Sequence, residues 1–196
     1  MGRPRQFDEA QLLDAATDLF WSQGFDDTSV GDVSAATGVG NGSIYAAYGS
    51  KRGLFLAAFE RYCDQRARFV RDTVVAAPGS ARDAVRALLF AIIDDCAAQP
   101  DRRGCLMLNS IAQLALRIPE VVTIGSRTTS AMEQGVAEGL AHRGDIDPAV
   151  LSAHSAGVVV MAQGLIQLSR LGTPTRRLRE IAAVSGPAMP AGAPVA

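Results

Sequence analysis

Apolar side chains recur at helical spacing along most of this chain. In the first predicted helix, residues 8–23, the apolar positions are Leu12, Ala16, Leu19 and Phe20. Asp8 precedes them with capping-box spacing to Gln11, and Gly24 follows as a typical helix stop. This segment therefore predicts an amphipathic helix with defined ends.

The same period continues downstream and is interrupted at intervals by glycine, proline and capping residues. It predicts about nine helices, over residues 8–23, 29–36, 40–47, 51–76, 81–98, 104–118, 120–142, 148–171 and 174–184. No strand pattern, coiled-coil heptad or internal repeat stands out. The expected fold class is all-α. The tail over residues 185–196 is rich in Pro, Gly and Ala and is expected to be disordered.

Residues 28–51 hold two short helical segments on either side of Gly38. Positions that would face inward between two crossing helices are small or apolar: Val33, Thr37, Val39, Ile44 and Ala47. Gly38 supplies the positive φ that ends one helix and redirects the chain. Together with the preceding helix, this spacing predicts a helix-turn-helix, whose second helix enters the DNA major groove. The alternative is a helical hairpin with no nucleic-acid role.

The residues around this unit form a specific set: Arg3-Pro4-Arg5, Ala15-Ala16, Leu19-Phe20, Gly24-Phe25, Thr28-Ser29-Val30, Gly38-Val39, Gly42-Ser43-Ile44-Tyr45, Gly49-Ser50-Lys51 and Leu54-Phe55. This set, over residues 3–60, resembles the TetR family of one-component transcriptional repressors. Beyond residue 60 the likeness is one of architecture. The resemblance implies a helix-turn-helix DNA-binding domain over residues 1–50, a helical-bundle domain for ligand binding and dimerisation over 51–184, and the tail.

The resemblance also implies which residues touch DNA. The expected contacts are Arg3 and Arg5 in the basic arm, Thr28 and Ser29 as anchors, and Asn41, Gly42, Ser43, Tyr45, Tyr48 and Lys51 in and after the recognition helix. This chain departs from the family by having Asn41 where lysine is common, and Ala46 and Ala47 where bulkier side chains often sit. The operator sequence therefore cannot be inferred from these residues.

Charge limits how the chain can bind nucleic acid. The first 52 residues hold four cations (Arg3, Arg5, Lys51 and Arg52) against seven acids (Asp8, Glu9, Asp14, Asp18, Asp26, Asp27 and Asp32), and the whole chain has a net charge of −1. This balance argues against a protein that coats DNA through a broad basic surface. We expect binding to need paired half-sites and to weaken steeply with salt.

Composition argues against several other classes. No uninterrupted apolar stretch or signal peptide predicts a membrane protein. The three cysteines are not clustered, which fits a reducing compartment, so we expect a cytoplasmic protein. His142 and His154 have no metal-binding spacing, and no catalytic or phosphate-binding motif is present. We expect neither an enzyme nor a bound cofactor or metal.

The helix predicted over residues 148–171 is apolar on most sides, so it should be buried on most sides. It either forms the core of one subunit or packs against a second copy. The family resemblance favours a homodimer that pairs two recognition helices. In it, the 148–171 and 174–184 helices would pack together against the same helices of the second copy. The expected interface residues are Val150, Val158, Met161, Leu165 and Leu168.

Cys105 follows the paired Arg102 and Arg103 near a predicted helix start. Cations and a helix N-terminus both favour a thiolate, so Cys105 is a candidate redox or electrophile sensor. Certain TetR-like regulators have a similar Gly-Cys-Leu segment, and some of them sense electrophiles through a cysteine. The alternative is a small apolar side chain packed beside Leu106 and Met107.

The helical domain is expected to enclose a ligand pocket. The candidate lining residues are Phe69, Phe90, Met107, Asn109, Gln113, Met132, Met161, Gln163 and Gln167. Apolar walls with a few amides suit a small, largely apolar effector held by a few hydrogen bonds. The apolar members could equally be plain core, and the amide of Asn109 could bond a helix carbonyl.

Three functional hypotheses follow from the sequence. The first is a homodimeric repressor that leaves a palindromic operator when a small molecule occupies the helical domain. The second has the same scaffold but takes its signal from modification of Cys105. The third is a dimeric helical binding module whose contact with DNA is incidental. Activation in place of repression stays open.

Overall fold

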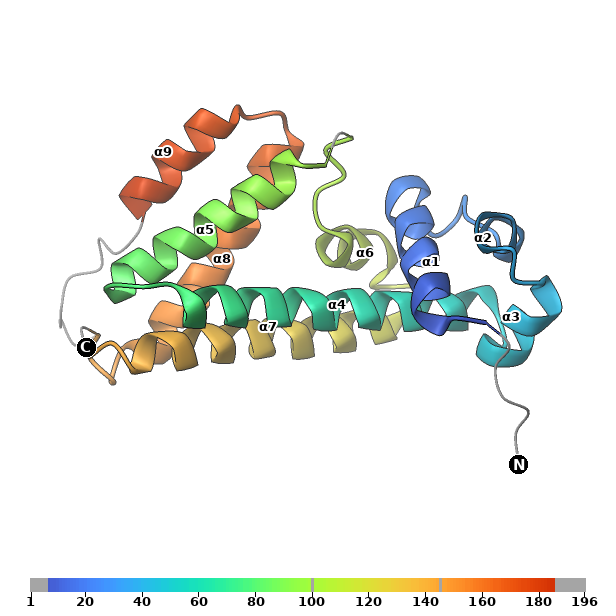
Figure 1. Cartoon of the computed structure of the whole chain (residues 1–196), viewed down its shortest axis with the longest axis horizontal. Helices are drawn as coiled ribbons and strands as arrows, with labels where there is room; N and C mark the ends of the chain where they lie inside the picture. The colour runs from blue at the N-terminus through green and yellow to red at the C-terminus, as the bar shows by residue number, and fades with distance from the viewer. Residues whose placement is uncertain (1–6, 100, 145, 186–196) are drawn as a thin grey trace.

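The computed structural model describes residues 7–99, 101–144 and 146–185, and over these ranges it is entirely helical, with nine α-helices and no strand. The helices are α1 (Glu9–Gln23), α2 (Val30–Thr37), α3 (Asn41–Tyr48), α4 (Lys51–Ala76), α5 (Ala81–Ala97), α6 (Leu106–Leu114), α7 (Pro119–Ala141), α8 (Leu151–Arg170) and α9 (Thr175–Ser185). The all-α prediction is confirmed. The molecule is elongated, with α1–α3 at one end, α5, α8 and α9 toward the other, and α4 and α7 along its length (Figure 1).

Polar side chains fix where several helices begin. The carboxylate of Asp8 accepts hydrogen bonds from the backbone N–H groups of Ala10 and Gln11, so it caps α1 as predicted. Ser29 and Ser80 each form a full capping box at α2 and α5, with an aspartate three residues later. Ser50 accepts from the N–H of Gly53 and caps α4.

Two helices are shorter than the sequence pattern predicts. Gly104 has a φ of 71° and Cys105 is the N-cap, so α6 begins at Leu106 instead of residue 104, and it ends at Leu114 instead of 118. Asp147 and the proline after it form a turn, with the Ala149 N–H donating to Asp147 Oδ1, and α8 therefore begins later than predicted.

The buried apolar side chains form two clusters. The first, called the head core below, joins α1, α2 and α3 to the first half of α4, to α6 and to the start of α7. It contains a cluster of the rings of Phe20, Phe25, Phe55 and Phe59, with centroids 5.0–6.1 Å apart in stacked and edge-to-face contacts. The second, called the body core, joins the second half of α4 to α5, α7, α8 and α9. Helix α4 therefore belongs to both cores.

Glycines in α7 allow α4 and α7 to pack closely. A Cβ added to Gly135 would lie 2.7 Å from Arg71 Cβ, and one added to Gly139 would lie 2.5 Å from Val74 Cγ1. The absent side chains let the two backbones approach to a distance that alanine would prevent. These glycines weaken the helical pattern of the sequence, but they are positions of close contact between helices.

The capping box of α2 predicts a defined pH dependence. Hydrogen bonds from the Ser29 backbone and hydroxyl hold the pKa of Asp32 below its ordinary value of 3.8. A lowered folded-state pKa stabilises the fold above the unfolded value, and this contribution is lost as pH falls through the folded pKa. Thermal unfolding of Asp32→Asn should therefore show a lower Tm than the parent at pH 6, and the difference should shrink toward pH 3.

The control is Asp27→Asn, which removes another exposed aspartate of the same region. Its difference in Tm from the parent should stay small at every pH. If the Tm difference for Asp32→Asn is the same at both ends of the titration, the cap does not act through its charge.

Candidate nucleic-acid interface

Helices α2 and α3 form the predicted helix-turn-helix. Gly38 ends α2 with a φ of 71° and ψ of 3°, the left-handed conformation that glycine adopts without steric cost. Val33 and Ile44 are fully buried in the head core and fix α3 against α2. The opposite face of α3 is exposed, and its sequence from Asn41 to Tyr48 carries no charged side chain.

The first turn of α3 presents several of the predicted DNA-contact residues to solvent. Asn41, Gly42 and Ser43 are all exposed, and Tyr45 retains 50% of its accessible surface. The N-cap of α3 is Gly40, so no side chain caps the first backbone N–H groups. A free helix N-terminus of this kind can bind a phosphate, and neutral polar side chains can bond base edges.

Other predicted contacts are occupied inside the protein. Thr28 is 1% exposed and its hydroxyl donates to the carbonyls of Gly24 and Leu19, so in this conformation its side chain is engaged within the protein. Ser29 is exposed, but its hydroxyl donates to Asp32 Oδ2 at 2.7 Å. The ammonium of Lys51 donates to the Asp26 carbonyl at 2.9 Å and lies 4.7 Å from the centre of the Phe25 ring.

The tyrosine and arginine next to this turn are also engaged. The Tyr48 hydroxyl donates to Glu9 Oε1 on α1 at 3.2 Å, and Arg52 pairs with Glu120 at the start of α7. The predicted contacts Arg3 and Arg5 lie outside the described residues. In this conformation the exposed surface of α3 is therefore neutral, and the nearby cations Lys51 and Arg52 support the fold.

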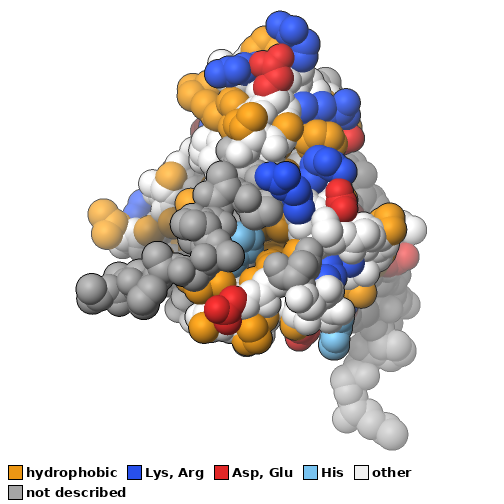
Figure 2. Space-filling view, turned by 90° about the vertical axis from the view of Figure 1, so that its left-hand side faces the viewer, with side chains coloured by type: hydrophobic (Ala, Val, Ile, Leu, Met, Phe, Trp, Pro, Cys, Tyr) orange, Lys and Arg blue, Asp and Glu red, His pale blue; other side chains and the backbone are white. Residues whose placement is uncertain are grey.

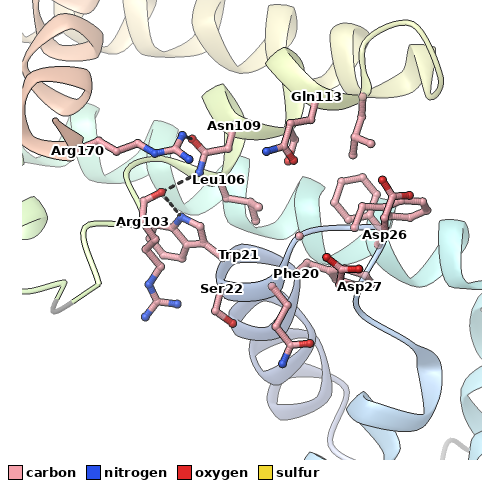
Figure 3. A pocket seen from close by; sticks show the side chains of 16 residues that line it. Phe20, Trp21, Ser22, Asp26, Asp27, Arg103, Leu106, Asn109, Gln113 and Arg170 are labelled. Carbon is pink, nitrogen blue, oxygen red and sulfur yellow. Dashed lines mark hydrogen bonds between the residues drawn. The ribbon is translucent and has the colours of Figure 1, made fainter.

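A polar network that the sequence did not predict joins the helix-turn-helix unit to the rest of the chain (Figure 3). The carbonyl of Arg103 accepts the indole N–H of Trp21 on α1 at 3.3 Å and the amide of Asn109 on α6 at 2.7 Å. Arg170 at the end of α8 donates to Asn109 Oδ1 at 2.5 Å. We call Trp21, Arg103, Asn109 and Arg170 the seam.

The seam is reinforced by charge and surrounds a pocket. The guanidinium of Arg103 lies 4.5 Å above the Trp21 ring and pairs with Asp18 at 3.3 Å. A pocket of about 300 Å³ lies between the end of α1 and α6, and Gln113 also lines it. Asn109 and Gln113 were both predicted to line an effector pocket in the helical domain. They line this pocket between α1 and α6 instead.

A second connection lies between Asp26 and Arg117. Their side chains form two hydrogen bonds of 2.7 and 2.8 Å, which tie the loop after α1 to the turn before α7. These hydrogen bonds from Arg117 hold the pKa of Asp26 below its ordinary value. The α1–α2 loop is thus held by Arg117 before α7 as well as by contacts inside the DNA-binding unit.

Cys105 is buried under the seam. It is 6% exposed and accepts a 3.4 Å hydrogen bond from the hydroxyl of Tyr62, which in turn accepts the N–H of Leu106. Burial, with Cys105 adding to it, raises the pKa of Tyr62 well above its ordinary value, so the phenol keeps its proton. The Arg103 guanidinium stacks on Trp21 and bonds Gln99, so it is not aimed at the thiol as the sequence suggested.

Only part of the predicted effector pocket lines one space. A core cavity of about 30 Å³ lies among α4–α8, and its walls include Met107, Met132 and Gln163. Phe69 instead lines a surface cleft, and Phe90 packs beneath the guanidinium of Arg179 at 5.5 Å. Met161 packs against the body core outside the cavity, and Gln167 is exposed. The cavity walls also contain Arg66 and Cys105.

Helix α8 leaves a different face free from the one predicted. Val158 and Leu165 are 3% and 2% exposed because they pack in the body core of their own subunit, and Leu168 and Met161 are half-buried beside them. Val150, just before the helix, is partly exposed. The exposed stripe, called the α8 stripe, consists of Ala153, Gly157, Val160, Gly164, Gln167 and Leu171. The sequence missed it because α8 is apolar on several sides.

Helix α8 also has the length and composition of a membrane-crossing helix, and it is the one such helix among the described residues. Helices that form protein cores share that composition. In the same part of the chain, no group of three or more His, Cys, Asp or Glu side chains could hold a metal ion.

Comparisons with known proteins agree with this geometry. Residues 12–58, from α1 to the start of α4, match the model of bacterial regulatory proteins of the tetR family. The chain is 31% identical over 186 residues to the HTH-type transcriptional repressor ComR of Escherichia coli (strain K12), which covers 92% of this chain and 88% of ComR. It is 46% identical to the repressor BdcR of the same strain over 61 residues, 31% of each protein.

A solved structure of similar fold holds DNA. It is a cysteine mutant of the TetR family transcriptional regulator CifR complexed with 26-bp double-strand operator DNA. The two chains superpose with a TM-score of 0.74 and 28% identity over 96% of this chain and all of the other. The fold, the exposed recognition helix and the extent of the likeness to ComR lead to one conclusion: this chain belongs to the TetR family of bacterial regulatory proteins and is a DNA-binding transcriptional regulator, not an enzyme.

Proposed function

We propose that the protein is a cytoplasmic homodimeric repressor that leaves a palindromic operator when a small, largely apolar effector enters its helical domain. The observation that carries the DNA-binding part is the exposed first turn of α3, with Asn41, Gly42 and Ser43 free and Ile44 buried behind them. The names of ComR and BdcR as repressors support repression over activation.

A second copy of the chain is the occupant that we propose for the α8 stripe. Val160 is 66% exposed, and a Cβ added to Gly157 or Gly164 would meet nothing within 4 Å, so another helix can approach closely there. Helix α9 turns its apolar side to α5 within the subunit and exposes Arg176, Arg177 and Arg179. Figure 2 faces the end of the molecule that lies away from α1–α3. Arginine side chains gather in the upper part of this end, where α9 lies. We therefore assign the apolar centre of the dimer to α8 and its polar border to α9.

The effector part of the proposal rests on the position of the core cavity. Met107 and Cys105 at the start of α6 form part of its wall, and Asn109 of the same helix belongs to the seam. A ligand that enlarges the cavity would displace α6, and the Arg103 carbonyl would carry that movement to Trp21 on α1. The two recognition helices of a dimer would then change their separation, which lowers affinity for a fixed operator spacing.

A second candidate signal is modification of Cys105, favoured by the fact that this residue lines the core cavity. A quinone that displaces the side chains of the cavity wall and reaches Cys105 would accept the thiol by conjugate addition. The sulfur bonds a ring carbon, and the thiol proton and the displaced ring proton end on the two oxygens, which gives a hydroquinone thioether. The adduct would fill the cavity as an effector does.

Removal of polar groups from α3 should weaken operator binding. Asn41→Ala and Tyr45→Ala should each cost about 1–3 kcal/mol in binding to the DNA upstream of the protein's own gene, because each removes a base or phosphate contact. Fluorescence anisotropy over a salt series would measure both affinity and salt dependence. Gln134→Ala, an exposed site on α7, is the control. Unchanged affinity in both α3 variants would contradict the assignment of the recognition helix.

A charge placed in the α8 stripe should break the dimer. In Val160→Glu two carboxylates would meet near the two-fold axis, and like charges brought together at an interface cost several kcal/mol, so we expect a monomer and the loss of operator binding. Light scattering after size exclusion would measure the mass. Val75→Glu, at a 58% exposed site on α4, should remain a dimer. A dimeric Val160→Glu would show that another face makes the contact.

Cys105→Ser separates the two candidate signals. The variant should still bind the operator. Under the ligand hypothesis, a reversible effector releases both the wild-type protein and the variant from DNA, and 1,4-benzoquinone releases neither. Release of wild-type protein from DNA by the quinone, together with an intact Cys105→Ser complex, would favour covalent sensing. Release of both proteins would place the reaction at another residue, such as Cys96.

A further inference from the structure

Arg66 stands between the core cavity and a surface cleft. The cleft, of about 360 Å³, lies between α1 and α4 and is lined by Trp21, Tyr62 and Asp95 among others. Among the residues that the structure describes, Arg66 alone lines both this cleft and the core cavity. The remaining cavity wall is apolar except for Cys105 and Gln163. The wall of the cavity thus has one charged group, and it lies where the cavity meets the surface.

The contacts of Arg66 hold it in this position without burying it completely. Its guanidinium pairs with Asp95 Oδ2 at 3.0 Å and lies 4.6 Å from the centre of the Phe69 ring. The side chain of Arg66 is 18% exposed and that of Asp95 is 35% exposed. A cation so little hydrated needs a partner at all times, so it can leave Asp95 only for another acceptor.

We propose that the effector enters through this cleft and binds Arg66 with an oxygen acceptor, a carbonyl or a carboxylate, while a short apolar tail enters the core cavity. This inference rests on the repressor function proposed above and specifies the chemical class of its ligand. A guanidinium has five N–H donors in a fixed fork, so it can bind the head group in exchange for Asp95. At Arg66 itself an ammonium head is disfavoured because it meets a like charge, although Asp14, Asp18 and Asp95 line the cleft through which it would pass.

Side chains that can move provide room for the tail. The cavity of about 30 Å³ holds little more than a water molecule, but Met107, Met132 and Leu108 form part of its wall. Methionine adapts readily to new packing, so a tail can displace these side chains. Movement of Met107 displaces α6, whose first turn bears the hydrogen bonds of Tyr62 and the seam. The proposed ligand therefore disturbs two contacts of α6: its hydrogen bond to Tyr62 on α4, and the seam that connects it to Trp21 on α1.

The test compares head groups on one tail. Isothermal titration of the full-length protein with 2-heptanone, heptanoate and heptylamine should show that the ketone or the carboxylate binds roughly tenfold or more tightly than the amine. Which of the two oxygen heads binds better tells a neutral effector from an acidic one. Asp95→Asn should strengthen heptanoate binding, because the competing carboxylate is gone. Arg66→Met should abolish the preference for oxygen heads, and Arg68→Met, at an exposed site on the same helix, should keep it.

Several outcomes would overturn the proposal: equal or tighter binding of heptylamine, no binding of any of the three probes, or an unchanged preference in Arg66→Met. Circular dichroism confirms that each variant is folded, and Arg66→Lys, which keeps a cation but loses the fork, is the second variant if the methionine variant unfolds. The titrations contain no DNA. If the protein fails to bind its operator in a separate assay without probes, the repressor function fails, whatever the titrations show.

Discussion

Helix α4 runs from the head core into the body core without a break, and this continuity constrains everything else in the chain. Its first half packs Phe55 and Phe59 against α1–α3, and its second half packs Val70 and Val74 against α5 and α7. A helix shared in this way cannot act as a flexible linker, since bending it would open both cores. Glycines 135 and 139 of α7 press against its second half. Any signal must therefore shift the packing of α4 or pass beside it.

The seam offers the route beside α4. Its central acceptor, the Arg103 carbonyl, lies between two residues with left-handed backbone, Arg102 at a φ of 51° and Gly104 at 71°. A non-glycine residue with positive φ costs free energy and persists only where its surroundings fix it. Here the fixed peptide carries hydrogen bonds from α1 and α6 together. A small change in this segment would alter both contacts at once, which suits a point that transmits a movement of α6 to the DNA-binding unit.

The sequence could predict features that depend on contacts between nearby residues, but not those that depend on residues far apart in the chain. The turn at Gly38, the cap at Asp8, and the buried Val33 and Ile44 rest on neighbours within one or two helical turns, so local patterns predicted them. The burial of Thr28 was not foreseen, because a hydroxyl in a sequence pattern does not show whether its donor is already used. The seam joins Trp21 to Arg103, 82 positions apart, and no local pattern contains that distance. The single tryptophan of the chain near the end of the first helix was the available signal.

The candidate sites differed in the same way. The exposure of the α3 residues that we expect to contact DNA was predictable, because a helix-turn-helix fixes which turn faces outward. The free face of α8 was not, because Val158, Leu165 and Val160 are equally apolar and only the packing of α5 and α7 decides which of them is covered. Arg66 was not predicted as a site residue either, since an arginine on a long helix is usually solvated. Its importance comes from a cavity that five helices form together.

The uncharged surface of α3 has a consequence for how the protein searches a genome. Non-specific affinity for DNA comes almost entirely from cations close to phosphates. From Phe7 to the end of α3 there are no cations at all, and Lys51 and Arg52 just beyond are engaged with Asp26 and Glu120. Non-specific contacts would then depend mainly on the predicted arm residues Arg3 and Arg5, and with so few cations the protein would gain little from sliding along random sequence. The number of copies in the cell, more than one-dimensional diffusion, would then set how quickly an empty operator is filled again.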